Sequence, residues 1–167
     1  MFNLSKEALS FLNTMRKSSS ANNYSNSKVN NKVKIVFTNG CFDILHSGHI
    51  TYLNQARSLG DFLFVGLNSD ASIKKIKGPD RPINNQQDRK FVLENLKAVD
   101  FVEIFEEDTP LELIKTVVPD ILVKGGDWEI SKIVGADFVI YHGGEVKSLK
   151  FIEGKSTTNI IKIIQNL

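Results

Sequence analysis

Two of the three histidines of the chain lie in one tetrapeptide, His46-Ser47-Gly48-His49. Two imidazoles three positions apart can reach the same anion, and each ring is a hydrogen-bond donor that can also carry charge. Gly48 has no Cβ, so a ligand can approach its backbone closely. If a helix begins here, the free N–H groups of its first turn and the positive end of its dipole suit a phosphate. The tetrapeptide therefore predicts a loop that binds phosphate groups.

A strand and a helix must position this loop. Residues 33–38 are mainly apolar or β-branched and are followed by the turn signal Asn39-Gly40, which predicts a buried strand. Beyond Gly48 the apolar residues recur every three or four positions, which predicts a helix that Gly60 would end as a C-cap. The carboxyl end of a strand, followed by a helix N-terminus, is where α/β sheets bind their ligands.

The rest of the chain alternates predicted strands with predicted helices, which indicates an α/β fold built on a doubly wound, five-stranded parallel sheet. Apolar runs mark the strands, and segments of helical spacing lie between them. The later strands are expected at 62–67, 101–105, 121–124 and 138–141, with 146–149 as a further edge; the helices are expected after Asp70, at 85–97, from a cap at Thr109 to about 117, and at 158–165.

The first 31 residues differ from the rest in composition. Residues 1–17 carry apolar side chains on one helical face and end on Arg16 and Lys17, which predicts a short amphipathic helix. Residues 18–31 are rich in Ser and Asn, which predicts a linker. The chain is thus expected to divide into an extension, 1–31, and one domain, 32–167. The apolar face of the helix must pack on this domain, on a sister subunit or on another protein.

Composition narrows the possible partners. The chain has 167 residues, enough for one domain, and a net charge of only +2, which leaves no basic surface of the kind that nucleic-acid binders need. A single cysteine excludes an internal disulfide and is typical of the reducing cytoplasm. No apolar run approaches the length of a membrane span, and the N-terminus lacks the features of a secretory signal. We expect a cytoplasmic protein with no nucleic-acid or membrane partner.

The sequence gives weaker support to four other kinds of site: a dinucleotide-binding loop, a P-loop, a zinc site and a cysteine nucleophile. A dinucleotide-binding loop requires G-x-G-x-x-G after the first strand, and the sequence there is G-C-F-D. The segment 154–156 matches the end of a P-loop but lies near the C-terminus. A zinc site from Cys41 and the two histidines would have no common spacing, and Cys41 as a nucleophile would lack an acidic residue to orient a histidine.

Six stretches of the chain resemble known enzymes. Thr38–His49, T-N-G-C-F-D-I-L-H-S-G-H, resembles the signature of the nucleotidyltransferase superfamily, whose core is H-x-G-H. Five stretches that follow in order are similar to the bacterial heptose-1-phosphate adenylyltransferases: Leu67–Ser72, Lys77–Pro82, Phe105–Pro110, Pro119–Asp127 and Ser156–Lys162. This resemblance covers about Lys32 to the C-terminus. It implies a Rossmann-like nucleotidyltransferase fold that transfers AMP from ATP to a sugar 1-phosphate. The implied acceptor is D-glycero-β-D-manno-heptose 1-phosphate, and the product is ADP-heptose for the lipopolysaccharide core.

The resemblance also implies roles for particular residues. His46 and His49 would bind the triphosphate and stabilise charge at the α-phosphorus, and Lys77 would close over the phosphates. Mg²⁺ would arrive on the triphosphate, and no protein ligand for a metal is expected. The acceptor would contact Asp43, Asn68, Asp70 and Arg81. The expected nucleotide-binding residues are Thr38, Asn39, Gly40, Phe42, Gly48, Arg89, Lys124, Gly125, Gly126, Asp127, Ser156, Thr157 and Thr158.

Several alternatives stay open on the sequence. Arg89 could pair with Asp88 or Glu94 instead of a phosphate, Trp128 could stack on a base or cover the sheet edge, and Ser156 could be only an N-cap. Glycerol-3-phosphate cytidylyltransferases are a second possible match. They carry Arg and Asp where this chain has Phe151 and Gly126. A catalytically silent nucleotide-binding module is a third.

The resemblance carries expectations about partners as well. It implies a homodimer. Related transferases are often fused behind a sugar kinase, and no kinase-sized segment precedes residue 32, so a separate sugar kinase and a phosphatase are expected to act in the same pathway.

Overall fold

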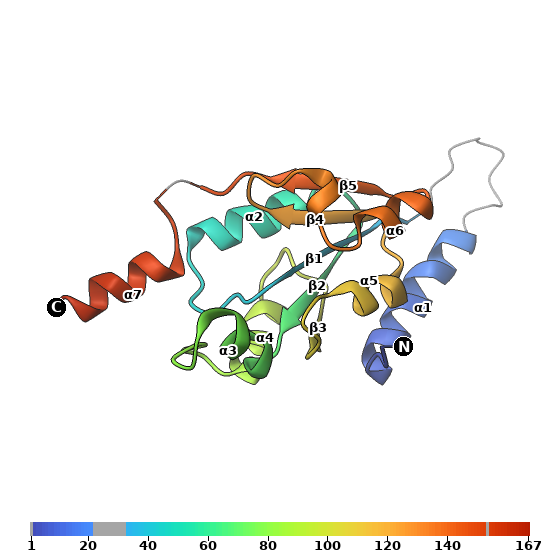
Figure 1. Ribbon diagram of the computed structural model, residues 1–167. Coiled ribbons are helices and arrows are strands. Elements are labelled where there is room, and N and C mark those ends of the chain that lie inside the picture. The colour runs from blue at the N-terminus through green and yellow to red at the C-terminus, as the bar shows by residue number, and fades with distance from the viewer. Residues whose placement is uncertain (1, 22–32, 153) are drawn as a thin grey trace.

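The computed structural model describes residues 2–21, 33–152 and 154–167 (Figure 1). Its centre is a parallel sheet of five strands in the order β3-β2-β1-β4-β5. The central strand β1 pairs with β2 on one side and β4 on the other. The predicted α/β, doubly wound fold is confirmed. The strands are β1 Ile35–Gly40, β2 Phe62–Asn68, β3 Phe101–Phe105, β4 Ile121–Gly125 and β5 Glu145–Leu149.

Helices cover both faces of this sheet (Figure 1). Helices α2 (Ser47–Arg57) and α4 (Gln86–Glu94) pack on one face, and α1 (Lys6–Ala21), α5 (Leu111–Val117) and α6 (Ala136–Tyr141) pack on the other. The short helix α3 (Asp70–Lys77) follows β2, a 3₁₀ turn covers Ile130–Lys132, and α7 (Thr157–Gln165) extends away from the sheet at the C-terminus. None of the helices described is long and apolar enough to cross a membrane.

The central strands are buried on both faces, as expected for a parallel sheet. Along β1, Val36 belongs to the apolar cluster under α2 and α4, and Phe37 belongs to the cluster under α1, α5 and α6. On β4, Leu122 and Val123 divide between the same two clusters. Side chains alternate between the two faces along a strand. Thr38, which follows Phe37, therefore points toward α2 and α4, and Lys124, which follows Val123, points toward α1, α5 and α6.

One predicted strand is wrong. Residues 138–141 form part of helix α6, and the fifth strand is β5, which the sequence indicated only as a possible edge. A four-residue apolar run does not distinguish a strand from a buried helical turn. Here Ala136 and Val139 are buried three positions apart, and Gly135 adopts φ +86 before the helix begins. β5 lies at the sheet edge and is only partly buried, so its apolar signal is weak.

The observed ends of two helices differ from the prediction. Helix α2 ends at Arg57 with Ser58 as its C-cap in a right-handed conformation, so Gly60 is not a left-handed cap. A Cβ at Gly60 would lie 2.7 Å from Val36 Cγ2 and 2.8 Å from the Lys34 carbonyl oxygen, so close packing on β1 requires glycine there. Helix α5 begins at Leu111 with Pro110 at the N-cap position, one residue later than the predicted cap at Thr109.

Helix α1 packs on its own domain, which decides among the three possibilities left by the sequence. The Phe11 ring lies 5.2 Å from that of Phe101 and 5.8 Å from that of Phe62. At the start of the helix, Glu103 accepts hydrogen bonds from the backbone N–H and the hydroxyl of Ser5, each at 2.8 Å. The helix continues to Ala21, so the linker prediction is wrong for 18–21; the predicted linker residues 22–31 lie outside the described part of the chain.

Phe11→Ala should destabilise the domain without slowing turnover. The half-buried ring fills space between α1 and the β2–β3 edge, and its loss should cost about 2 kcal/mol, below the 3–5 kcal/mol of a fully buried Phe. Urea unfolding measures this cost. Leu9→Ala is the matched control because Leu9 is 47% exposed on the same helix. Equal unfolding midpoints for the two variants would contradict the docking of α1.

Candidate active site

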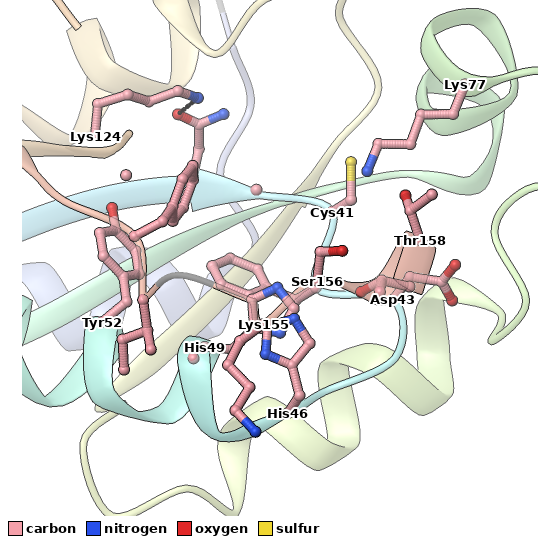
Figure 2. Close-up of a pocket in the computed structure, with 18 of the residues that line it drawn as sticks. Cys41, Asp43, His46, His49, Tyr52, Lys77, Lys124, Lys155, Ser156 and Thr158 are labelled. Atoms are coloured by element: carbon pink, nitrogen blue, oxygen red, sulfur yellow. Dashed lines mark hydrogen bonds between the residues drawn. The ribbon is translucent and has the colours of Figure 1, made fainter. Parts of the chain in front are cut away.

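A pocket opens at the carboxyl edge of the sheet, above the ends of β1 and β4 (Figure 2). The chain leaves β1 toward β2 on one side, and β4 lies on the other, so the pocket lies at the topological switch point of the sheet. The lining comes from five parts of the chain: Asn39, Gly40, Cys41, Phe42 and Asp43 at and after the end of β1; His46, Gly48, His49 and Tyr52 around α2; Lys77; Lys124, Gly125 and Trp128 at and after the end of β4; and Phe151, Ile152, Lys155, Ser156, Thr157 and Thr158 after β5.

The two histidines form a stacked pair at the N-terminus of α2. Their ring centroids are 4.0 Å apart with 29° between the planes, and His46 is the N-cap residue. The Nδ1 atoms of both rings are buried and have no hydrogen-bond partner among the described residues. Gly48 makes room for this pair, because a Cβ there would lie 2.9 Å from His46 Nδ1 and 3.0 Å from Lys155 Cβ. The two imidazoles thus line the pocket at the start of a helix, and each has a buried nitrogen without a partner in the described structure.

Burial and neighbouring cations keep the histidines neutral at pH 7. Burial, with smaller contributions from His46 and Lys77, lowers the pKa of His49 to about 4. Burial, followed by the charge of Lys155, also lowers the pKa of His46. Each ring therefore meets a ligand as a neutral donor or acceptor, and a bound anion would favour its protonation.

Phe42 supports the ring of His49. Its own ring lies 5.5 Å from the imidazole in an edge arrangement, and its backbone adopts φ 45, a region that non-glycine residues rarely occupy. A Cβ at Gly40 would lie 2.9 Å from Phe42 Cε2, so glycine at the end of β1 is required by this packing. The unusual backbone of Phe42 is thus used to fix the position of His49.

A second helix N-terminus lines the pocket. Ser156 is the N-cap of α7, and its hydroxyl accepts a hydrogen bond from the Asn159 N–H at 3.1 Å. The hydroxyl of Thr157 donates to the Ile44 carbonyl at 3.0 Å and so ties α7 to the loop after β1. The predicted N-cap at Ser156 is confirmed. Two helix starts, those of α2 and α7, therefore border the same pocket.

Aromatic rings surround Gly125 and Gly126 at the end of β4. A Cβ at Gly125 would lie 2.7 Å from Phe151 Cε1, and a Cβ at Gly126 would lie 2.7 Å from Trp128 Nε1. The Trp128 indole N–H donates to the Gly125 carbonyl at 3.0 Å. Nearby, burial raises the pKa of the Tyr52 phenol to about 12. These rings form an apolar side to a pocket whose other side is rich in donors.

Asp43 holds a separate loop in place. Its buried carboxylate accepts hydrogen bonds from the backbone N–H groups of Ile83 and Asn84 at 2.9–3.0 Å and pairs with the Arg81 guanidinium at 2.6 Å. Burial raises the pKa of Asp43, but the bonds from Asn84, Ile83 and Arg81 together lower it below its usual value. Asp43 therefore ties the segment that follows Lys77 to the histidine loop.

Arg89 makes no bond to Asp88 or Glu94, the pairings left open by the sequence. Its buried guanidinium donates to the carbonyls of Cys41, Asn68 and Asn84 and to the Asp70 carboxylate, at 2.7–3.0 Å. These four acceptors leave it little capacity for a triphosphate, and Arg89 does not line the pocket. The structure places it under the site as a crosslink between loops.

Most of the site residues predicted from the sequence line the pocket, and seven do not. The lining lacks Thr38, Asn68, Asp70, Arg81, Arg89, Gly126 and Asp127. The first five make contacts within the protein: Thr38 of β1 shares a 2.6 Å hydrogen bond with the Tyr52 hydroxyl of α2, and the other four bond the segments around the site.

Five further residues line the pocket but are not among the site residues predicted from the sequence: Cys41, Tyr52, Phe151, Ile152 and Lys155. Tyr52 could have been found, because it lies three positions after His49 on one helix. Among the described residues, no group of three or more His, Cys, Asp or Glu side chains could hold a metal ion.

The chain was compared with protein-family models and with known protein sequences. A family model described as cytidylyltransferase-like matches residues 37–163. The chain is 61% identical over 132 residues to the bifunctional protein HldE of Aliarcobacter butzleri and 60% identical over 132 residues to that of a Marinomonas species. Each match covers 79% of this chain and 27–28% of the relative, so the chain spans about a quarter of the length of these relatives.

Solved structures show the same fold. The lipopolysaccharide core biosynthesis protein of Thermoplasma volcanium is 31% identical with a TM-score of 0.58, and the match covers 74% of this chain and 99% of that one. Pantothenate synthetase from Thermus thermophilus, at 17% identity and a TM-score of 0.51 over 76% of this chain and 61% of that one, shares the fold.

Asp43→Asn should loosen the loop that follows Lys77. The amide has one acceptor oxygen, so it cannot serve Ile83, Asn84 and Arg81 together, and the Arg81 guanidinium, whose side chain is only 13% exposed, loses its counter-charge. Breaking a buried pair of this kind costs about 3–5 kcal/mol. Urea unfolding and amide hydrogen exchange over residues 78–85 measure the effect. Asp80→Asn, in the same loop but exposed, is the control. Unchanged exchange in the Asp43 variant would show that Asp43 does not fix the loop.

Proposed function

The chain belongs to the cytidylyltransferase-like family of nucleotidyltransferases, and on this premise we propose that it transfers AMP from ATP to a sugar 1-phosphate, releasing pyrophosphate. One observation carries the proposal. A single pocket is bordered by the N-termini of α2 and α7, by the side chains of Lys77 and Lys155, and by His46 and His49, whose buried Nδ1 atoms have no hydrogen-bond partner among the described residues. Such a set of donors suits a polyphosphate chain.

The pocket supplies positioning and charge stabilisation, which is what phosphoryl chemistry requires of a protein. Its lining contains one carboxylate, Asp43, and that group is committed to Arg81 and the loop N–H groups. A sugar 1-phosphate is already anionic at neutral pH, so its oxygen needs no general base to attack. The absence of an available carboxylate dyad from the lining is consistent with this mechanism.

Each donor then has a role. The triphosphate lies between the N-termini of α2 and α7, where Ser156, Thr157 and Thr158 hold its β/γ end. His46 and His49 donate to the oxygens that gain charge as the α-phosphorus becomes five-coordinate. Lys77, the last residue of α3, extends its ammonium group toward the pocket and closes over the phosphates (Figure 2). Mg²⁺, carried by the triphosphate, would neutralise charge on the leaving pyrophosphate.

The aromatic side of the pocket favours adenine over cytosine. Phe151 packs over Gly125, and Trp128 lies against Gly126. The similar cytidylyltransferases carry Arg at the position of Phe151 and Asp at that of Gly126. A flat apolar surface, without that Arg and Asp to recognise the edge of a cytosine, suits a large purine, because stacking depends on ring area.

The choice of acceptor rests on the relatives. Identity of 60–61% with the HldE proteins and 31% with a lipopolysaccharide core biosynthesis protein supports D-glycero-β-D-manno-heptose 1-phosphate as the acceptor and ADP-heptose as the product. A kinase and a phosphatase that act on the sugar would supply this substrate. We further expect the enzyme to work as a homodimer.

A pyrophosphate-release assay tests the reaction. With ATP and D-glycero-β-D-manno-heptose 1-phosphate, the wild-type chain should release pyrophosphate at least about tenfold faster than with CTP, the order expected for one extra stacking contact. Assays with glycerol 3-phosphate and other sugar 1-phosphates serve as controls. Equal turnover with CTP would favour the cytidylyltransferase alternative, and no release with any pair would favour the silent nucleotide-binding module.

His49→Ala should reduce kcat by a factor of about 10²–10³, because one donor aimed at transition-state charge is lost. ATP affinity should weaken far less, since the contribution belongs to the transition state. Single-turnover kinetics and nucleotide titration separate the two. His142→Ala is the matched control, because His142 lies on the exposed end of α6, outside the pocket lining. Near-normal kcat in the His49 variant would make this histidine structural.

A further inference from the structure

Lys124 lies on the opposite face of the sheet from the histidines. It follows Val123 on β4, and Val123 is aligned with Thr38 of β1, whose hydroxyl contacts Tyr52 of α2. The next side chains on each strand, Lys124 and Asn39, therefore point to the face covered by α5. The pairing of β1 with β2 supports the same face for Asn39. Asn39 is aligned with Gly66, where a Cβ would lie 3.1 Å from Leu113 of α5.

The Lys124 ammonium has little compensation from the protein. Its one hydrogen bond in the described structure goes to Asn39 Oδ1 at 3.3 Å, and no described carboxylate lies within ion-pair distance of it. Burial lowers its pKa, an effect that the nearby Cys41 opposes. Lys124 is half-buried, and a partly desolvated cation without a carboxylate is costly unless something else supplies the counter-charge. Lys124 lines the pocket, so a bound anion can do so.

The pocket therefore has donors on two sides of the end of β1. Figure 2 shows Lys124 and Lys77 on the side of the Cys41 thiol, and His46 and His49 on the other. Displacement at the α-phosphorus requires the attacking oxygen and the leaving pyrophosphate to be roughly in line. If pyrophosphate departs toward the N-termini of α2 and α7, the attacking group must approach from the side of Lys124.

We propose that Lys124, oriented by Asn39, binds the phosphate of the sugar 1-phosphate acceptor, opposite the departing pyrophosphate. An acceptor phosphate oxygen forms the new bond to the α-phosphorus, the bond between that phosphorus and the oxygen bridging to the β-phosphorus breaks, and its electron pair leaves with pyrophosphate. This inference rests on the proposed function. It also fills a gap, because Asn68, Asp70 and Arg81 are committed to the loops and do not line the pocket.

A binding experiment tests the site without turnover. Trp128 is the only tryptophan of the chain and lines the pocket, so its fluorescence reports occupancy. With a non-hydrolysable ATP analogue at saturation, inorganic phosphate is titrated into wild type, Lys124→Met and Lys124→Arg. We expect Lys124→Met to bind phosphate at least about tenfold more weakly, the loss of one hydrogen bond to a charged group, and Lys124→Arg to restore part of it. Equal phosphate affinity in wild type and Lys124→Met overturns the proposal.

The matched control is Lys155→Met, a neutralised lysine on the histidine side of the same pocket. It should weaken the ATP analogue and leave phosphate affinity within about twofold. Steady-state kinetics add a second readout: Lys124→Met should raise KM for the sugar 1-phosphate about tenfold or more and change KM for ATP little. A rise confined to ATP would assign Lys124 to the nucleotide. If wild type fails to turn over any sugar 1-phosphate, the proposed function fails, and the phosphate titration still decides the role of Lys124.

Discussion

The buried guanidinium of Arg89 holds together the chain segments that meet above β1 and β2. It bonds the loop after β1 through Cys41, the end of β2 through Asn68, and the segment before α4 through Asn84. Asp43 adds a second crosslink between two of these segments. Loops carry most polar groups of an active site but have little core of their own, so their geometry must come from such bonds. The pocket exists in this form because these two charged side chains are turned inward.

This arrangement divides the charged and polar residues of the region into two groups with different tasks. Arg81 pairs with Asp43 and Arg89 pairs with Asp70, while Asp43 and Arg89 also bond the loop backbone, so these groups hold the structure. His46, His49, Lys77, Lys124 and Lys155 border the pocket with few protein partners and no available acid. Uncompensated donors in a partly desolvated pocket interact strongly with an anion and need little reorganisation when it arrives. The same desolvation lowers the pKa values of both histidines and so favours their neutral form.

The central part of the fold could be predicted because its signals are local. Buried runs such as 62–67 and 101–105, and the strand-to-helix switch at His46–His49, need no knowledge of distant contacts. The prediction failed where the signal was short or shared. Residues 138–141 have an apolar pattern that fits either a strand or one turn of helix, and the choice depends on Ala136 and Val139 facing the sheet. The role predicted for Gly60, a helix cap, is wrong, because the contacts that require glycine there are with Lys34 and Val36, far away in sequence.

By itself, the sequence determined the class of fold and the strand end at which the candidate site lies, and it led to the proposal that the two histidines bind phosphate, because residue type, spacing and strand order are properties of the chain. Only the tertiary structure decided which charged residues act on a ligand and which hold the loops. Asp43, Asp70, Arg81, Arg89 and Lys124 all appear as polar residues near the right motifs. Their roles depend on burial and on partners up to 85 positions away, such as Asn39 for Lys124. A buried charge takes its role from whatever neutralises it, and that partner is set by the fold.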